Sequence, residues 1–301
     1  MDRFDEMNVF LRVAESGSFT RAAEDLRLPR ASVSLAVQQL EARLGTRLLH
    51  RTTRRVQVTQ DGQALLERCR VLLSDLDEVE GLFLRDRSQI AGKLKVDVSS
   101  RMGRMVIAPA LPDFFRRYPH IELEFGMTDR LIDLVREGVD CAIRGALTME
   151  DSSLVSRRIA EFTVVNCASR SYIEQYGMPE SLADLAGHWI INYASPTTGR
   201  IYPWEYVEGG ETKTVPMKSR ITVNNAEAYM ACCQAGLGLI QVPARDIAGM
   251  LAGVGLVEVL PAWRPAPMQV CALYPHRRHL SRRVQAFIDW VAELLGRTTV
   301  M

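Results

Sequence analysis

Features that mark membrane-bound, exported or disulfide-linked proteins are missing from this sequence of 301 residues. No run of eighteen apolar residues occurs, so neither a membrane-spanning helix nor a membrane partner is expected. The start, Met-Asp-Arg-Phe-Asp-Glu, lacks the apolar segment of a secretory signal, which predicts a cytoplasmic protein. The six cysteines include no CxxC pair, and in that compartment we expect reduced, mostly buried thiols.

The motifs of common catalytic sites are also missing. The sequence contains no GxxxxGK(S/T), HExxH or GxSxG pattern. His276 and His279 enclose two arginines, which repel a metal cation. These absences predict a protein that is not an enzyme and that binds neither a cofactor nor a metal.

Basic residues concentrate near the N-terminus, although the net charge is only +1. Residues 1–60 hold ten arginines and seven acidic residues, and residues 43–55 hold five arginines and no acid. Such a local cluster is expected where a protein meets a polyanion. A solvated basic turn would show the same cluster, so the neighbouring elements decide between the two interpretations.

Those elements predict a winged helix-turn-helix over residues 1–58. Apolar residues at helical spacing indicate a first helix up to Gly17, and Ser18 suits the N-cap of a second. Pro29 suits the start of a third helix, over residues 30–43. Two short strand-like segments, residues 47–49 and 54–59, would form the wing.

In this motif the second helix of the pair enters the major groove of double-stranded DNA. Hydroxyl and amide side chains pair with base edges, and arginines of the wing grip phosphates. The sequence therefore predicts an operator-binding protein. The expected contacts are Arg30, Ser32, Ser34, Gln38, Arg51, Thr52, Arg54 and Arg55.

A long helix is predicted over residues 59–91. Its apolar residues recur at alternating steps of four and three, which is the seam of a coiled coil. Two DNA half-sites require two binding heads, so we expect this helix to make the protein a dimer, or part of a tetramer. The alternative is a helix packed on its own domain. The expected dimerisation residues are Leu65, Leu72, Leu76, Val79 and Phe83.

Residues 92–301 alternate between strand and helix patterns, with helices expected over 105–118 and 131–137. Such alternation predicts an α/β fold with mixed or parallel sheets covered by helices.

Nearly the whole chain resembles the LysR-type transcriptional regulators. The resemblance is carried by "FLRVAESGSFTRAAEDL", "ASVSLAVQQLEARLGTRLLHRTTRRVQVTQDG", "GKLKVDVSS", "NNAEAYMACCQAGLGLIQVP" and "LSRRVQAFIDW". It implies a C-terminal domain like the periplasmic binding proteins, with two α/β subdomains around an inducer cleft. Subdomain I would span 92–161 and 268–301, and subdomain II would span 162–267. RNA polymerase is a further candidate partner.

One departure concerns the recognition helix. The family often has Ser-Arg-Gln where this chain has Ser34-Leu35-Ala36. Two common base- or phosphate-contacting side chains are therefore missing, and operator preferences cannot be taken over from the family.

The effector site is predicted where strands of the α/β sheets end. Ligands bind there because helix N-termini and free backbone N–H groups face the ligand. The resemblance implies the same strand-end positions, and hydroxyls beside an arginine suit a small carboxylate. The expected residues are Ser99, Ser100, Arg101, Thr128, Arg144, Asn166, Asn224 and Pro243.

Alternatives remain for particular residues of this region. Arg144 could instead form a structural salt bridge, and Trp204 and Tyr206 could either line the ligand or pack across a hairpin. The alternative function is a constitutive or redox-tuned repressor, suggested by Cys232 and Cys233. Because adjacent cysteines form a strained disulfide, we expect these two to be packing residues.

Overall fold

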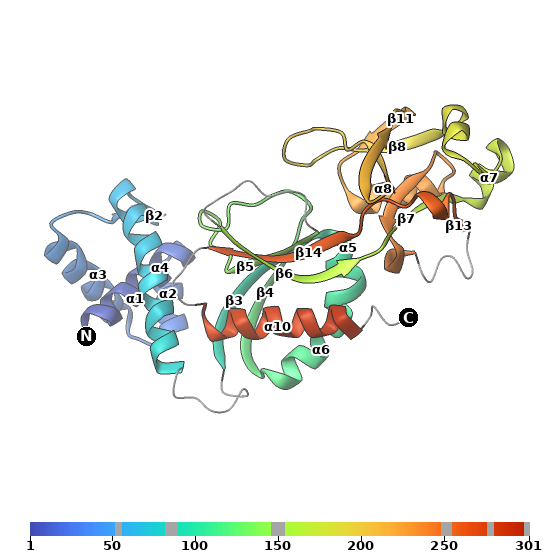
Figure 1. Ribbon diagram of the computed structural model, residues 1–301. Coiled ribbons are helices and arrows are strands. Elements are labelled where there is room, and N and C mark those ends of the chain that lie inside the picture. The colour runs from blue at the N-terminus through green and yellow to red at the C-terminus, as the bar shows by residue number, and fades with distance from the viewer. Residues whose placement is uncertain (52–55, 82–89, 146–153, 248–254, 276–279, 298–301) are drawn as a thin grey trace. The chain divides into compact units, whose positions relative to one another are not determined.

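The computed structural model describes residues 1–51, 56–81, 90–145, 154–247, 255–275 and 280–297 (Figure 1). It divides into two compact units, residues 1–85 and 86–301. No helix of the described residues is long and apolar enough to span a bilayer.

The first unit is a winged helix-turn-helix, as predicted. Its elements are α1 (Arg3–Ser16), α2 (Phe19–Leu26), α3 (Arg30–Leu44), β1 (Leu49–Arg51), β2 (Val56–Val58) and α4 (Gln60–Gly81). Local signals set these boundaries. The Ser18 side chain caps α2 by accepting from the Arg21 N–H, and left-handed Gly17 and Gly45 end α1 and α3. Strands β1 and β2 pair antiparallel.

The core of this unit joins α1, α2 and α3 to the first half of α4. Leu66 and Cys69 of α4 are buried in it, and Leu65 and Leu73 pack against it. Leu65, expected at a dimer seam, thus contacts its own unit, as the alternative interpretation proposed. Leu72 is 44% exposed and Leu76 is half-buried. The side chain of Val79 and all of Phe83 lie outside the described residues.

The second unit is built on two groups of strands, here called subdomains I and II. Subdomain I holds a five-stranded mixed sheet in the order β4-β3-β5-β14-β6, with β3 parallel to β4 and β5, and β14 antiparallel to β5 and β6. The strands are β3 (Ala91–Val98), β4 (His120–Met127), β5 (Cys141–Gly145), β6 (Leu154–Phe162) and β14 (Met268–Pro275).

Helices cover one face of this sheet (Figure 1). One continuous helical segment runs through α5 (Ser100–Met102), a π-helical turn (Gly103–Ile107) and α6 (Ala108–Arg117), and α10 (Arg282–Arg297) lies beside α6. Phe114 of α6 packs its ring on Phe287 and Trp290 of α10, in the largest apolar core of the unit.

The helix predicted over residues 131–137 is wrong, because this segment forms only a hydrogen-bonded turn. Leu134 is buried, but Leu131 and Val135 are 51% and 48% exposed. Only Leu134 and, in part, Ile132 are buried against the sheet, which is too little apolar contact to stabilise a helix of two turns.

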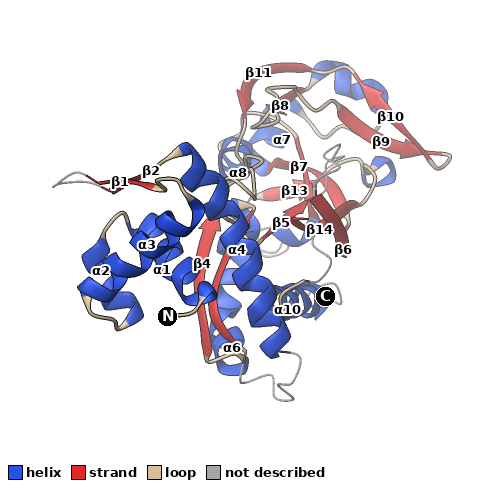
Figure 2. Cartoon of the chain, turned by 90° about the vertical axis from the view of Figure 1, so that its left-hand side faces the viewer, coloured by secondary structure: helices blue, strands red, loops and turns tan. Residues whose placement is uncertain are grey.

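Subdomain II contains smaller sheets. Strands β12 and β13 flank β7, β8 pairs parallel with β11, and β9 and β10 form the hairpin at the edge of Figure 2. The elements are β7 (Val164–Ser169), α7 (Arg170–Tyr176), β8 (Trp189–Tyr193), β9 (Trp204–Glu208), β10 (Glu211–Val215), β11 (Lys218–Val223), α8 (Ala226–Gln234), β12 (Ile240–Pro243) and β13 (Leu256–Glu258). The α/β class with two subdomains is confirmed.

Gly62 marks the tightest approach of α4 to the wing. A Cβ atom there would lie 2.1 Å from the Leu48 carbonyl oxygen and 2.7 Å from Val58 Cγ1. We expect Gly62→Ala to destabilise the first unit by about 1–3 kcal/mol through overpacking, although Ala normally favours a helix over Gly by about 1 kcal/mol. Urea unfolding of the full chain measures this effect. Gln63→Ala, at an exposed neighbour, is the matched control; equal midpoints for the two variants would contradict the clash.

Candidate functional sites

Helix α3 carries four of the eight side chains predicted to contact DNA. Arg30 and Gln38 are exposed, and Ser32 and Ser34 are half-buried. Leu35 lies on the same side with 54% of its surface exposed, whereas Ala36 is buried in the core. This chain departs from the family's Ser-Arg-Gln at Leu35 and Ala36, and of these two residues only Leu35 faces outward.

Leu35 was not among the predicted DNA contacts. An exposed apolar side chain on a recognition helix can contact the methyl group of thymine in the major groove. The signal was present in the sequence, because residues 31, 35, 38 and 42 share one side of a helix with a period of 3.6.

The wing is less fully described. The side chain of Arg51 and all of Thr52, Arg54 and Arg55 lie outside the described residues. Arg43, which belongs to the same basic stretch, forms an ion pair with Glu6 of α1. Its charge is thus partly neutralised within the fold, while Arg47 remains exposed.

A cavity of about 460 Å³ lies between the two subdomains of the second unit. Its walls are mainly apolar and aromatic, as in most pockets for small molecules. Subdomain I contributes Met102 and Phe162, and subdomain II contributes Tyr193, Trp204 and Tyr229. Trp204, one of the two residues left open by the sequence, therefore lines the cavity; Tyr206 is not among the lining residues.

The cavity collects half of the predicted effector residues. Ser99, Arg101, Arg144 and Pro243 line it, whereas Ser100, Thr128, Asn166 and Asn224 do not. Asn166 shows why. It lies in the middle of β7 rather than at a strand end, and its buried amide donates to the carbonyl oxygens of Leu260 and Trp263. The sequence pattern predicts that this strand ends at Asn166, three residues before its actual end at Ser169.

Arg144 forms the salt bridge that was the alternative interpretation. Its guanidinium pairs with Asp97 and donates to the Asp97 carbonyl oxygen at 3.2 Å. Both residues are buried, and burial raises the pKa of Asp97 while Arg144 opposes that rise. A buried charge needs such a partner. Arg144 therefore reaches the cavity wall with its charge already balanced.

Arg245 differs from the other arginines of the wall. Its guanidinium lies 4.4 Å from the centre of the Phe162 ring, and its Nη1 is buried without a hydrogen-bond partner among the described residues. Burial lowers the pKa of Arg245, while the neighbouring Asp246 carboxylate opposes that change. Trp204 Nε1, also at the wall, is another buried donor with no partner in the described part of the chain. These two donors are uncommon, because buried N–H groups in proteins are nearly always paired.

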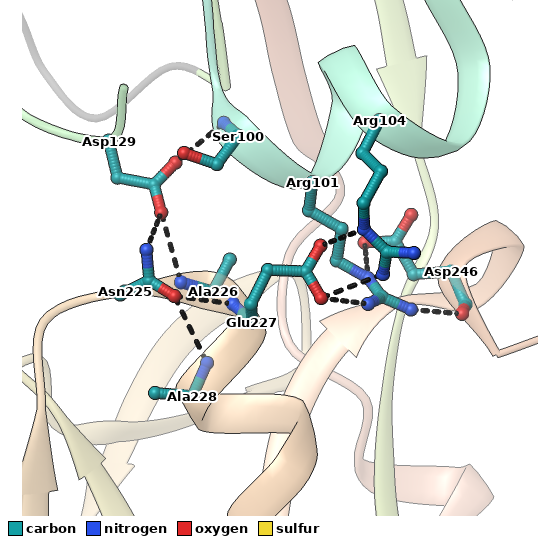
Figure 3. Close-up of polar contacts among 9 residues, drawn as sticks. All are labelled: Ser100, Arg101, Arg104, Asp129, Asn225, Ala226, Glu227, Ala228 and Asp246. Atoms are coloured by element: carbon teal, nitrogen blue, oxygen red, sulfur yellow. Dashed lines mark hydrogen bonds and ion pairs between the residues drawn. The ribbon is translucent and has the colours of Figure 1, made fainter. Parts of the chain in front are cut away.

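Ion pairs join the subdomains beside the cavity (Figure 3). Arg101, only 4% exposed, pairs with Asp246 at 3.2 Å and with Glu227 at 3.3 Å. Arg104 grips the same Glu227 carboxylate at 3.0 and 2.8 Å, which lowers the pKa of Glu227. Arg101 is thus bound within the protein.

The cysteines lie where packing, not reactivity, is expected. Cys233 is fully buried, and a contact with Cys167 together with burial raises the pKa of its thiol. Burial raises the pKa of Cys69 to about 11. A raised pKa keeps a thiol protonated and therefore unreactive.

Comparison with known proteins bears on both units. Residues 4–63 match the bacterial regulatory helix-turn-helix proteins of the lysR family, and residues 87–296 match the LysR substrate binding domain. This chain is a LysR-type transcriptional regulator. It is similar to the transcriptional regulator YhjC of Escherichia coli, with 40% identity over 98% of each chain. The activator AaeR of the same species is 34% identical over 96% of this chain and 93% of its own.

Solved structures of full-length regulators share this fold. CrgA of Neisseria meningitidis is 29% identical with a TM-score of 0.62, over 97% of this chain and 98% of its own. AphB of Vibrio cholerae is 26% identical with a TM-score of 0.56, over 99% and 100% of the two chains. The protein is thus a DNA-binding regulator of transcription.

Gln38 provides the test of base recognition by α3. We expect Gln38→Ala to relax the preference at one base position, at a cost of about 1–3 kcal/mol for the preferred base, because a bidentate amide contact is lost. Leu35→Ala should weaken a preference for thymine. Selection from a randomised DNA library measures both effects, with Gln63→Ala of α4 as the matched control. A uniform loss of affinity over all sequences would place Gln38 on the DNA backbone instead.

Proposed function

We propose that this regulator binds a small molecule with an acidic group in the cavity between its subdomains, and that binding changes its action on an operator. The cavity carries the proposal. Its volume of about 460 Å³ falls among ligand pockets, which span roughly 300–1,000 Å³. Its aromatic walls suit an apolar or aromatic body.

The acidic group of the effector would be held by Arg245. Arg101 and Arg144 also line the cavity, but each already has a carboxylate partner within the protein. Arg245 has none within ion-pair distance among the described residues. A carboxylate could satisfy its buried Nη1, with Trp204 Nε1 as a second donor. The sequence predicts the anion between Ser99–Ser100 and Thr128/Arg144 of subdomain I; this proposal instead assigns it to Arg245 of subdomain II.

The redox alternative has less support. Cys233 is buried with a raised pKa, and Cys232, its half-buried neighbour, points to a different side of the helix. A sensor thiol needs access to oxidant and a low pKa. Small-molecule binding is thus the function that the geometry supports best.

We further propose that α4 pairs two copies of the chain, so that two recognition helices meet two half-sites. Leu72 carries this idea, because it is a large apolar residue left 44% exposed on a helix that buries Leu66 and Cys69 in the core of its own unit. Closing the cavity on an effector would then change the angle between the two heads.

Leu72→Glu tests the pairing of α4. A charge buried without a partner at a helix seam costs several kcal/mol, so the variant should sediment as a smaller species than the wild-type chain. Gln63→Glu is the control, because nine residues at about 100° each place it on the opposite side of the helix. An unchanged sedimentation coefficient for Leu72→Glu would remove this surface from the interface.

The effector proposal predicts a preference for acids over neutral analogues. Phenylacetate should bind at least about tenfold more tightly than phenylacetamide, because a charge-assisted bond to Arg245 exceeds a neutral one. Arg245→Met should abolish this preference, while Arg136→Met, at an exposed arginine outside the cavity, should keep it. Isothermal titration measures both ligands, and thermal unfolding checks each variant. Equal binding of acid and amide by the wild-type chain would refute the acidic effector.

A further inference from the structure

Asp129 accepts hydrogen bonds from both subdomains at once (Figure 3). It follows β4 in subdomain I, where its Oδ1 accepts from the Ser100 N–H at 2.8 Å. Its Oδ2 accepts from Asn225 Nδ2 and from the Ala226 N–H of subdomain II, each at 3.1 Å. One carboxylate thereby joins residues that lie 29 and 97 positions away in the sequence.

The two backbone donors are the first N–H groups of helices. Ser100 begins the continuous helical segment that runs to Arg117, and Ala226 begins α8. Such groups have no partner inside their own helix and carry the positive end of its dipole. Asn225 caps α8 by accepting from the N–H groups of Glu227 and Ala228, at 2.9 and 3.0 Å. The Ala226 N–H alone is left for a partner across the junction.

The ion pairs beside Asp129 also join opposite charges across the two subdomains. Subdomain I presents Arg101 and Arg104, and subdomain II presents Glu227 and Asp246. At Asp129 the signs are exchanged. Subdomain I supplies the negative carboxylate, and subdomain II supplies the positive N-terminal end of α8.

We infer that Asp129 is a built-in anion, which fills the carboxylate site formed by two converging helix N-termini and holds the two subdomains together. We call Asp129 with its three hydrogen-bond donors the clasp. Asp129 lines the cavity together with Ser99, Arg101, Ala226 and Asp246, so the clasp forms one edge of the proposed effector site. Where the effector proposal holds, Asp129 also determines where in the cavity the acidic group of an effector binds. The acidic group of an effector is kept from the helix ends by Asp129 and is directed to Arg245.

Removal of the side chain and replacement of the anion test the clasp. Asp129→Ala should raise amide hydrogen exchange about tenfold or more in peptides spanning residues 98–104 and 224–230, because both helix ends lose a charge-assisted bond. Formate at tens of millimolar should restore protection in both peptides, since it fits the space of the lost carboxylate. Chloride at the same ionic strength should not.

Controls separate a clasp from a purely local role. Asp133→Ala removes an exposed acid in the same loop and should leave both peptides protected. Asp129→Asn keeps one acceptor oxygen and should give an intermediate result. Exchange that rises only in residues 98–104, or formate without effect on either peptide, would overturn the inference. No effector enters these measurements, so their outcome is independent of whether the cavity binds an acid.

Discussion

Unpaired backbone donors at the start of two helices are the constraint on which the second unit depends. Helices of both subdomains begin at the junction, and their first N–H groups must find acceptors or lose free energy on burial. Asp129 satisfies one backbone donor from each subdomain. Because the acceptor is a carboxylate, the same contact also matches the positive ends of both helices. This pairing and the ion pairs of Arg101 and Arg104 together join the two subdomains beside the cavity.

Burial also decides which arginine remains for a ligand. Arg101, Arg144 and Arg245 are chemically alike and all lie at the cavity wall. Two of them pair with carboxylates of the protein, whereas Arg245 lies against the ring of Phe162 and forms no ion pair with the described residues. Aromatic contact partly compensates a buried guanidinium but provides no hydrogen-bond acceptor. A difference in partners, not in residue type, thus separates structural arginines from the candidate ligand-binding one.

In the first unit, one helix serves both stability and proposed assembly. The first half of α4 closes the core of the DNA-binding head through Leu66 and Cys69, and Gly62 allows the wing to approach. One turn further along the same helix, Leu72 remains exposed. An effector-dependent movement of α4 would therefore carry the head with it, because helix and head share a single core.

The sequence by itself determined the elements whose signals are local. The helix-turn-helix with its Ser18 cap and the helical segment expected over 105–118, which ends at Arg117, follow from periodicity and capping residues that lie within a few positions of each other. Ser99, Arg101, Arg144 and Pro243 were placed at the cavity by the same strand-end reasoning.

Tertiary structure decided what depends on distant partners. The apolar spacing at 131–137 predicts a helix, but only Leu134 is fully buried, Ile132 is partly buried, and Leu131 and Val135 stay exposed. Asp129 was passed over because its role needs Ala226, and the charge of Arg144 was balanced by Asp97, 47 residues away. Arg245 stands out only in the tertiary structure, where no carboxylate of the described residues lies within ion-pair distance of its guanidinium. A sequence pattern shows which groups are charged or apolar, whereas the energy of each depends on the neighbours that folding brings to it.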